Sequence, residues 1–235
     1  MKKTIRLMAL VAMAAGLAFA ACGSNSKVGG QGDGAAAAEW VDLGLPSGLL
    51  WAKCNLGATK PEEYGDYYAW GETVTKEDYY WSTYKYCNGD YNQLTKYCND
   101  PEYGYNGFTD NLTTLQPSDD VATQKLGDGA RMPTETEWRE LLANTTSERT
   151  TENGVYGHKL TAANGKSLFF PAAGGRYGSG LLGAGWYGAY RSSSLRAYYP
   201  YRAGYFHYFN SDYQGVFDGD RQYGFSVRAV CASQN

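Results

Sequence analysis

The sequence predicts an α+β domain, with a mixed sheet, few helices and long irregular loops. The chain holds 30 Gly, many of them in turn signals such as Asn106-Gly107 and Asp218-Gly219, and the apolar runs between these turns are short. One segment carries a complete helix-start signal. The last apolar run before the C-terminus alternates with period two, as a strand does.

The first 39 residues are expected to lie outside the folded domain. Residues 1–21 have a basic start, an apolar run too short to span a bilayer and small residues before Cys22, which is the pattern of a secretory signal peptide. Ala20-Ala21-Cys22 is similar to a bacterial lipobox, so we expect cleavage before Cys22 and a lipid on its sulfur. Ordinary cleavage that leaves a thiol there is the alternative. Residues 22–39, rich in Gly, Ser and Ala, then form a flexible tether.

Residues 40–235 are sufficient for one domain with a sizeable core. The chain has a net charge of −3 at pH 7, and no block of basic residues follows the signal peptide. This charge balance argues against nucleic acid and against anionic membrane surfaces as partners of the domain.

Four segments of the domain have strand character. Val41–Leu45 and Leu49–Ala52 flank a Pro-Ser-Gly turn, and Ser167–Pro171 is a third apolar run. In Tyr223–Val230 the side chains alternate between two faces. Residues 64–105, rich in Tyr, Asp, Asn and Gly, are expected to form long loops over the sheet.

The helix signal lies between the second and third of these strands. Thr134 is the expected N-cap and Glu137, three residues later, completes a capping box. Trp138 and Leu141 then follow at helical spacing, and the helix should end near Asn144. The two Glu residues of the first turn are better explained by capping and by the helix dipole than as an acid–base pair.

Four Cys remain after Cys22, and in an exported protein an even number suggests disulfides. Four Cys allow three pairings. Cys87 and Cys98 bracket a short loop and are favoured as a local pair, and Cys54 and Cys231 pair if the two ends of the domain are adjacent. A zinc site is disfavoured because no Cys-x-x-Cys spacing occurs and the two His are isolated.

Residues 190–223 have an unusual composition. They hold eight Tyr, three Phe, one His and four Arg, but no Lys, Glu, Trp or Met. Tyr gives a large contact at low entropic cost, and Tyr and Arg often carry interface energy. Codons that end in a pyrimidine encode neither these four missing residues nor Gln, which occurs only at Gln214 and Gln222. The composition indicates a binding surface, and compositional drift of a Tyr-rich loop is the alternative.

The exposed members of this segment are expected to contact a ligand. The candidate contacts are Arg191, Arg196, Tyr198, Tyr199, Tyr201, Arg202, Tyr205, His207, Asp212, Tyr213, Phe217, Asp218 and Asp220. About a third of the aromatic residues should be buried supports. The candidates for these supports are Phe206, Tyr208 and Phe209.

Four stretches together resemble a large family of bacterial exported lipoproteins related to the formylglycine-generating-enzyme-like branch of the C-type lectin fold. They are Val41–Thr73, Arg131–Trp138, Phe169–Arg176 and Gly224–Cys231. The resemblance implies a C-type lectin-like domain in which the two chain ends pair in one sheet. A subset of this family resembles the variable proteins of diversity-generating retroelements, in which a C-terminal segment is mutagenised at adenines and precedes a fixed strand. Residues 190–223 occupy that place, before Gly224–Arg228.

The resulting hypothesis is a lipid-anchored binding protein of the cell envelope, held at the outer membrane. Its ligand is an unknown protein or glycan, it needs no cofactor or metal, and it is not an enzyme. Formylglycine-generating chemistry is disfavoured, because the resemblance implies a closely spaced Cys pair late in the domain and only Cys231 lies there. A fixed-specificity carbohydrate-binding protein, or an adhesin or structural lipoprotein, is the alternative.

A calcium-dependent lectin is a further alternative. Asp212, Asp218 and Asp220, with Asn210, would supply the oxygen ligands. The Glu-Pro-Asn and Trp-Asn-Asp signatures of sugar-binding C-type lectins are absent from the sequence. Asp-Gly turns explain these acidic residues more simply.

Overall fold

The computed structural model describes residues 38–127, 129–209 and 213–233. The expected signal peptide, the lipidation site Cys22 and nearly all of the tether lie outside the described residues, and so does Asp212. In the described part of the chain, no helix is both long and apolar enough to cross a membrane.

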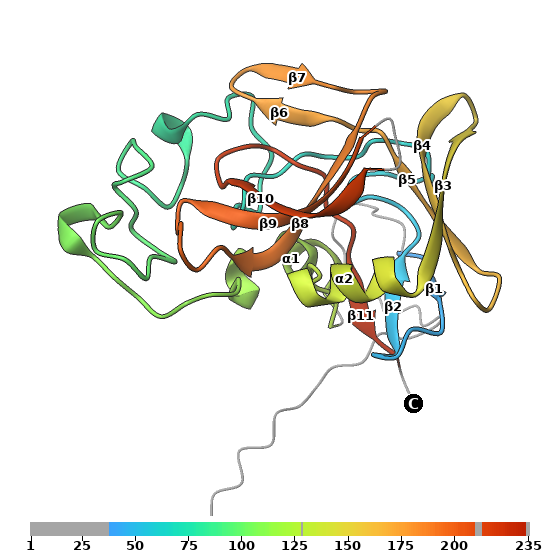
Figure 1. The fold of residues 1–235 in the computed structure, drawn as a ribbon. Helices are drawn as coiled ribbons and strands as arrows, with labels where there is room; N and C mark the ends of the chain where they lie inside the picture. The colour runs from blue at the N-terminus through green and yellow to red at the C-terminus, as the bar shows by residue number, and fades with distance from the viewer. Residues whose placement is uncertain (1–37, 128, 210–212, 234–235) are drawn as a thin grey trace, which may run out of the picture.

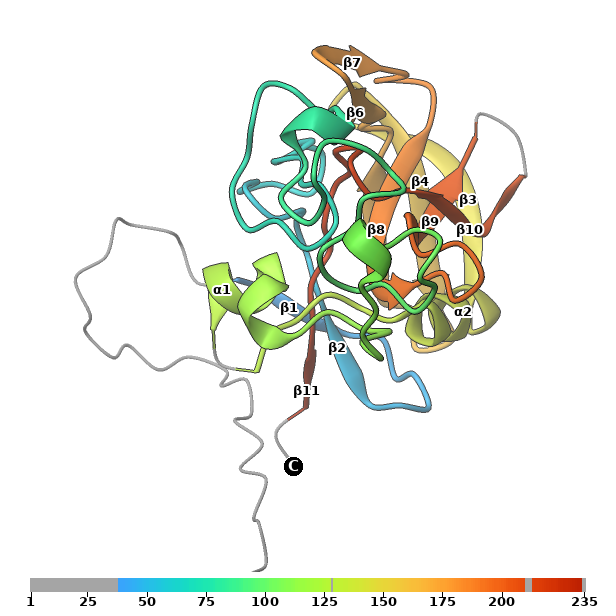
Figure 2. The same ribbon diagram turned by 90° about the vertical axis from the view of Figure 1, so that its left-hand side faces the viewer.

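Small antiparallel sheets and few helices make up the described residues, which confirms the predicted α+β class (Figure 1). The predicted mixed sheet is wrong, because every pair of described strands is antiparallel. One sheet joins the two ends of the domain in the order β1-β2-β11. Its strands are β1 (Trp40–Asp42), β2 (Leu49–Ala52) and β11 (Val230–Ala232). Figure 2 shows β11 alongside β2. The pairing of the chain ends agrees with the expectation.

A second sheet has the order β3-β4-β5. Its strands are β3 (Thr145–Glu152), β4 (Val155–Ala162) and β5 (Ser167–Pro171), and the separate hairpin of β6 (Gly175–Tyr177) and β7 (Gly180–Leu182) follows. The bounds of β2 and β5 match the sequence prediction. The strand β3 was not expected, because its sequence TTSERTTE has no apolar face and most of its side chains are exposed or half-buried.

The third sheet contains most of the Tyr- and Arg-rich segment. It has the order β10-β9-β8. Its strands are β8 (Gly188–Leu195), β9 (Arg202–Tyr208) and β10 (Gln214–Asp220). The segment that was expected to be a binding surface is therefore largely a regular sheet.

The prediction of a continuous strand over Tyr223–Val230 is wrong. Phe225 and Ser226 form only isolated bridges, to Tyr68 and Tyr190, and regular pairing starts at Val230. Side chains of both parities are buried from Gly224 to Val230. The segment runs between packed layers, so the period of two in its sequence does not separate a solvent face from a core face.

The predicted helix is confirmed as α2 (Glu135–Ala143). Thr134 Oγ1 accepts from the Glu137 amide at 3.3 Å, and the Glu137 carboxylate accepts from the Thr134 amide at 2.7 Å. Asn144 is the C-cap, and Trp138 is buried. A second helix, α1 (Val121–Leu126), was not predicted; it starts at Asp120, whose carboxylate accepts two backbone amides.

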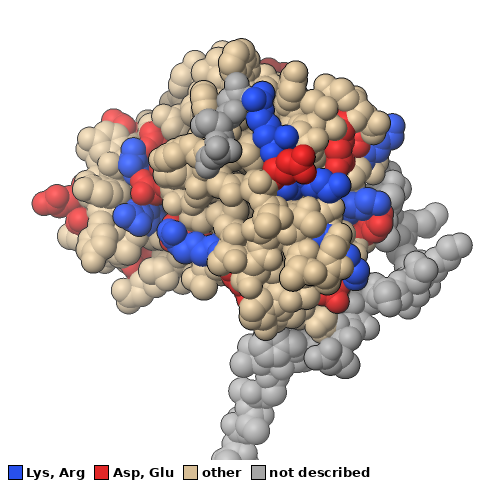
Figure 3. Space-filling model, turned by 45° about the vertical axis from the view of Figure 1, so that its right-hand side comes forward, with Lys and Arg blue, Asp and Glu red and all other residues tan. Residues whose placement is uncertain are grey.

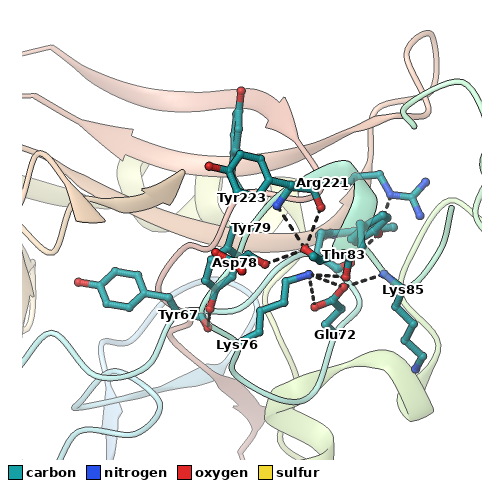
Figure 4. Close-up of polar contacts among 12 residues, drawn as sticks. Tyr67, Glu72, Lys76, Asp78, Tyr79, Thr83, Lys85, Arg221 and Tyr223 are labelled. Atoms are coloured by element: carbon teal, nitrogen blue, oxygen red, sulfur yellow. Dashed lines mark hydrogen bonds and ion pairs between the residues drawn. The ribbon is translucent and has the colours of Figure 1, made fainter. Parts of the chain in front are cut away.

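Residues 53–120 are largely irregular, as expected for 64–105, with three short 3₁₀ turns. These are η1 (Trp81–Thr83), η2 (Tyr105–Gly107) and η3 (Pro117–Asp119). Buried polar contacts, rather than pairing in a sheet, fix the position of these loops. The buried Glu72 accepts from Lys76 Nζ at 2.9 Å and from the Lys85 amide at 2.8 Å (Figure 4). Tyr79 donates its hydroxyl to the Tyr67 carbonyl at 2.7 Å.

Neither expected disulfide is formed, because Cys54, Cys87 and Cys98 are thiols. The Cys87 thiol donates to the Trp81 carbonyl and the Cys98 thiol to the Asp100 carbonyl, both at 3.1 Å, so each faces its own loop. Cys231 lies opposite Leu50 on β2. Cys54 lies in a bend beyond the end of β2, so the two Cys do not occupy paired positions of the sheet.

Candidate ligand-binding surface

The side chains of β9 alternate between the core and an outer face. Phe206 stacks on Trp138 with ring centroids 4.9 Å apart, and the Tyr208 hydroxyl donates to the Phe170 carbonyl at 2.6 Å. Both are buried, which confirms them as supports. Tyr205 and His207 have the opposite parity and are half-buried on the other face of the sheet.

Aromatic rings from several elements surround Tyr205 and His207. We call this group the outer aromatic face; its members are Tyr177, Tyr187, Tyr205, His207, Phe209, Tyr213, Phe217 and Tyr223. His207 lies 5.2 Å from Tyr187 and 5.9 Å from Phe217, and Phe217 lies 5.3 Å from Tyr213, all between ring centroids. The rings therefore form one continuous surface along β9 and β10.

Phe209 belongs to this face, so its assignment as a buried support is wrong. It is 46% exposed. It follows the last residue of β9 and has the parity of Tyr205 and His207, so its side chain leaves the sheet on the same side.

Sequence reasoning found Tyr205, His207, Tyr213 and Phe217 but missed other members of the face. Tyr177 lies on β6 and Tyr187 just before β8, outside the compositionally unusual segment. Only the fold brings them to it, so no local sequence signal identifies them. Tyr223 lay inside the segment and carried the same signal as the residues that were chosen.

Arg191 is wholly buried, so its assignment as a ligand contact is wrong. It pairs with Tyr205 across β8 and β9, but Ser226 pairs with the outer edge of β8 and Phe225 packs on the Arg191 side chain. Its guanidinium lies 4.3 Å from the centre of the Phe225 ring and donates to the Tyr223 carbonyl at 2.6 Å. Burial lowers the pKa of Arg191 to about 10, so it stays protonated at neutral pH. Arg191 is a support beneath the outer aromatic face.

The other charged candidates among the described residues form an ion-pair group on the opposite side of β9 and β10. Arg202 contacts Asp218 at 2.7 Å and Asp220 at 3.5 Å, and Arg196 contacts Asp218 at 3.4 Å. The two Arg side chains are 41% and 44% exposed, whereas Asp218 is 22% exposed. Among the described residues, no group of three or more His, Cys, Asp or Glu side chains is arranged to hold a metal ion.

A second aromatic group lies at the turn between β8 and β9. Tyr201 contacts Tyr91 and Tyr103 of the long loops, with ring centroids 5.3 and 5.2 Å apart. Tyr199 packs on Tyr201 at 6.0 Å, and Tyr198 is 81% exposed. The loops of residues 64–105 thus extend the exposed aromatic surface, as well as packing beneath it.

The candidate contacts therefore divide among three places on one sheet. The outer aromatic face lies near the hairpin between β9 and β10, the Tyr198–Tyr201 group lies at the other end of the sheet, and the ion pairs lie on its second face. On the side shown in Figure 3, positive and negative side chains are interspersed over a mainly uncharged surface. This pattern suits a ligand that is held mainly by contacts with the exposed aromatic rings. The charged side chains then decide which ligands fit.

The titration of His207 predicts a pH dependence of stability. Burial lowers the pKa of His207, whereas in the unfolded chain it is about 6.5. Above that value both states are neutral and the effect vanishes. As the pH falls below about 6.5 the unfolded state takes up the proton first, so stability is lost until the lowered pKa of the folded state is passed. We expect the melting temperature to fall more between pH 7.5 and 5 for the wild type than for His207→Gln; equal falls would contradict this.

Comparison of the chain with protein-family models, with curated proteins and with solved structures found no match. The function is therefore argued from the surface itself.

Proposed function

We propose that this protein is a lipid-anchored binding protein of the cell envelope, whose outer aromatic face captures a protein or glycan ligand. The observation that carries the proposal is the division of β9 into a buried and an exposed set. Phe206 and Tyr208 fix the strand in the core, while Tyr205 and His207 present half-buried rings on the other side. A rigid scaffold that offers clustered aromatic rings is the usual construction of a binding surface.

We further propose that this surface is diversified and that the domain is C-type lectin-like. The paired chain ends, the sparse helices and the long loops support the fold assignment. Side chains on the outer face can change without altering the core, because the strands are held by residues of the opposite parity. This separation supports a segment that tolerates many sequences.

In this proposal the N-terminal segment supplies attachment. Lipid on Cys22 anchors the chain in the outer membrane, and residues 22–39 give the domain reach. We assign the protein no catalytic role and no cofactor. Asp218 and Asp220 are engaged by Arg202, which supports a structural rather than a calcium-binding role for them.

Fixed carbohydrate specificity is the second candidate. Trp186 and Tyr198 are 62% and 81% exposed, and open ring faces suit stacking on sugars. Ligands selected in parallel from a glycan array and from a displayed random-peptide library would decide the ligand class.

A further inference from the structure

The two edges of the β10-β9-β8 sheet differ in how their backbone groups are satisfied. Along the outer edge of β8, Arg191 donates its amide to Ser226, Ser193 to Pro133 and Leu195 to Thr113, at 2.8 to 2.9 Å. Three separate chain segments therefore close that edge. The other edge is β10.

The hydrogen-bond register shows which backbone groups of β10 face outward. The amide of Phe209 donates to the Tyr213 carbonyl, and the amide of Arg221 donates to the Tyr201 carbonyl, both at 3.0 Å. Hydrogen-bonded pairs alternate along an antiparallel ladder. The groups that face β9 are therefore those of Gly215, Phe217 and Gly219, and the groups that point away are those of Gln214, Val216, Asp218 and Asp220.

Arg191 Nη2 donates to the outward carbonyl of Asp220 at 2.8 Å, but the outward groups of the rest of β10 remain open. No backbone or side-chain group in the described part of the chain hydrogen-bonds to the outward amides and carbonyls of Gln214, Val216 and Asp218. Of the described strands, only β9 pairs with β10, and α2 packs against a face of the sheet. The strand is paired on one side only.

β10 also lacks the features that usually protect an edge strand. Natural edges carry Lys, Pro or a bulge, but the sequence QGVFDGD has no Lys or Pro and its pairing with β9 is unbroken. The charges of Asp218 and Asp220 are taken up by Arg202 of the same sheet. By contrast, the outer strand β3 carries the charged residues Glu148, Arg149 and Glu152.

We infer that β10 is the docking strand for an extended segment of a protein ligand, which adds to the sheet as a fourth strand. The inference rests on the proposed function and names its ligand class as protein rather than glycan. Backbone pairing gives affinity that does not depend on sequence, and flanking side chains give specificity. A diversified receptor gains from having both kinds of contact. When Tyr213 or Phe217 changes, the specificity changes but the backbone contact remains.

The flanks of β10 define the chemistry of the segment. On one side, Phe217 and Tyr213 of the outer aromatic face accept apolar or aromatic side chains. On the other, Arg196 and Arg202 are paired with Asp218 and Asp220 and the group has no net charge, so polar side chains are favoured. The segment therefore alternates apolar and polar residues, with a period of two.

The test begins with 12-residue peptides selected from a random displayed library on the purified lipoprotein. Each residue of a selected peptide is then N-methylated in turn. We expect about tenfold weaker binding at every second residue and little change between them, because only alternate peptide amides face β10. In the complex, the amides of Gln214, Val216 and Asp218 should become protected from hydrogen exchange, whereas those of Gly215, Phe217 and Gly219 are already protected in the free protein.

A matched pair of variants tests the same point on the protein. Val216→Pro removes an outward amide that does not pair with β9 and should weaken peptide binding about tenfold. Val216→Thr keeps the amide and should bind within about threefold of the wild type. The N-methyl scan uses the unaltered protein, so it remains decisive if Val216→Pro does not fold.

Four results would overturn the inference. They are an N-methyl scan without alternation, unchanged exchange at Gln214, Val216 and Asp218, binders from the glycan array alone, and a wild-type dimer that Val216→Pro makes monomeric. The last would assign β10 to a second copy of the chain. In each case the proposed function still stands if Tyr213→Ser/Phe217→Ser abolishes ligand binding, and it fails if that variant binds normally.

Discussion

Replacing Arg221 with Met is expected to lower the free energy of unfolding by about 3–5 kcal/mol. Arg221 is wholly buried and lies directly after β10. Its Nη1 donates to the Pro200 carbonyl at 2.8 Å and its Nε to the Tyr84 hydroxyl at 2.9 Å. Its guanidinium lies 5.0 Å from the centre of the Trp70 ring.

These contacts join the irregular loops of residues 64–105 to the β10-β9-β8 sheet. Figure 4 shows Arg221 and Tyr223 next to the loop of Tyr79 and Thr83. Met fills a similar volume but leaves the acceptors that Arg221 satisfies without donors in a buried site. Urea unfolding measures the change.

Arg196→Met is the matched control for this prediction. Its side chain is 44% exposed and its ion pair with Asp218 spans 3.4 Å, so the expected loss is within about 1 kcal/mol. Equal stability of the Arg221 and Arg196 variants would show that the loops are held by other contacts.

Replacing Tyr213 and Phe217 together with Ser is expected to weaken binding of any selected ligand by about 100-fold or more. Buried aromatic anchors at interfaces cost about 2 kcal/mol or more each when truncated. Tyr213 is 59% exposed and Phe217 half-buried, so the double variant should remain folded. Titration calorimetry or surface-based binding would measure the loss, with the melting temperature as a check of folding.

The control for the binding prediction is a pair of exposed aromatic residues at the η2 turn, away from the proposed surface. Tyr105 and Phe108 are 40% and 37% exposed. Tyr105→Ser/Phe108→Ser should bind within about threefold of the wild type. If the two double variants lose affinity equally, the outer aromatic face is not the binding site.

Local signals predicted local structure well. The capping box of Thr134 and Glu137 and the apolar runs of β2 and β5 each reside in a few consecutive residues, and each element formed where it was expected. The strand β3 has no such signal, because its stability comes from pairing with β4 rather than from an apolar face.

Composition alone does not predict which side chains of the segment are buried and which reach solvent. Arg191 and Arg196 lie in the same Tyr- and Arg-rich segment, but Arg191 is buried on β8 next to residues 224–226 and Arg196 lies at an exposed turn. Register and strand order decide which residues of a segment reach solvent, and both depend on distant pairing. The predicted disulfide between Cys54 and Cys231 failed for the same reason. Both chain ends lie in one sheet, as expected, but the register of that sheet does not bring the two Cys together.

We propose that residues 190–223 form a diversified binding surface, and sequencing the DNA beside the gene tests this proposal most directly. We expect a non-coding copy of codons 190–223 near a reverse-transcriptase gene, differing from the coding copy only where it has adenine. The differing codons should be those of exposed residues such as Tyr198, Tyr205, His207 and Phe217, while codons of the buried Phe206 and Arg221 stay identical. A copy whose differences fall on buried codons, or the absence of any copy, would contradict the claim.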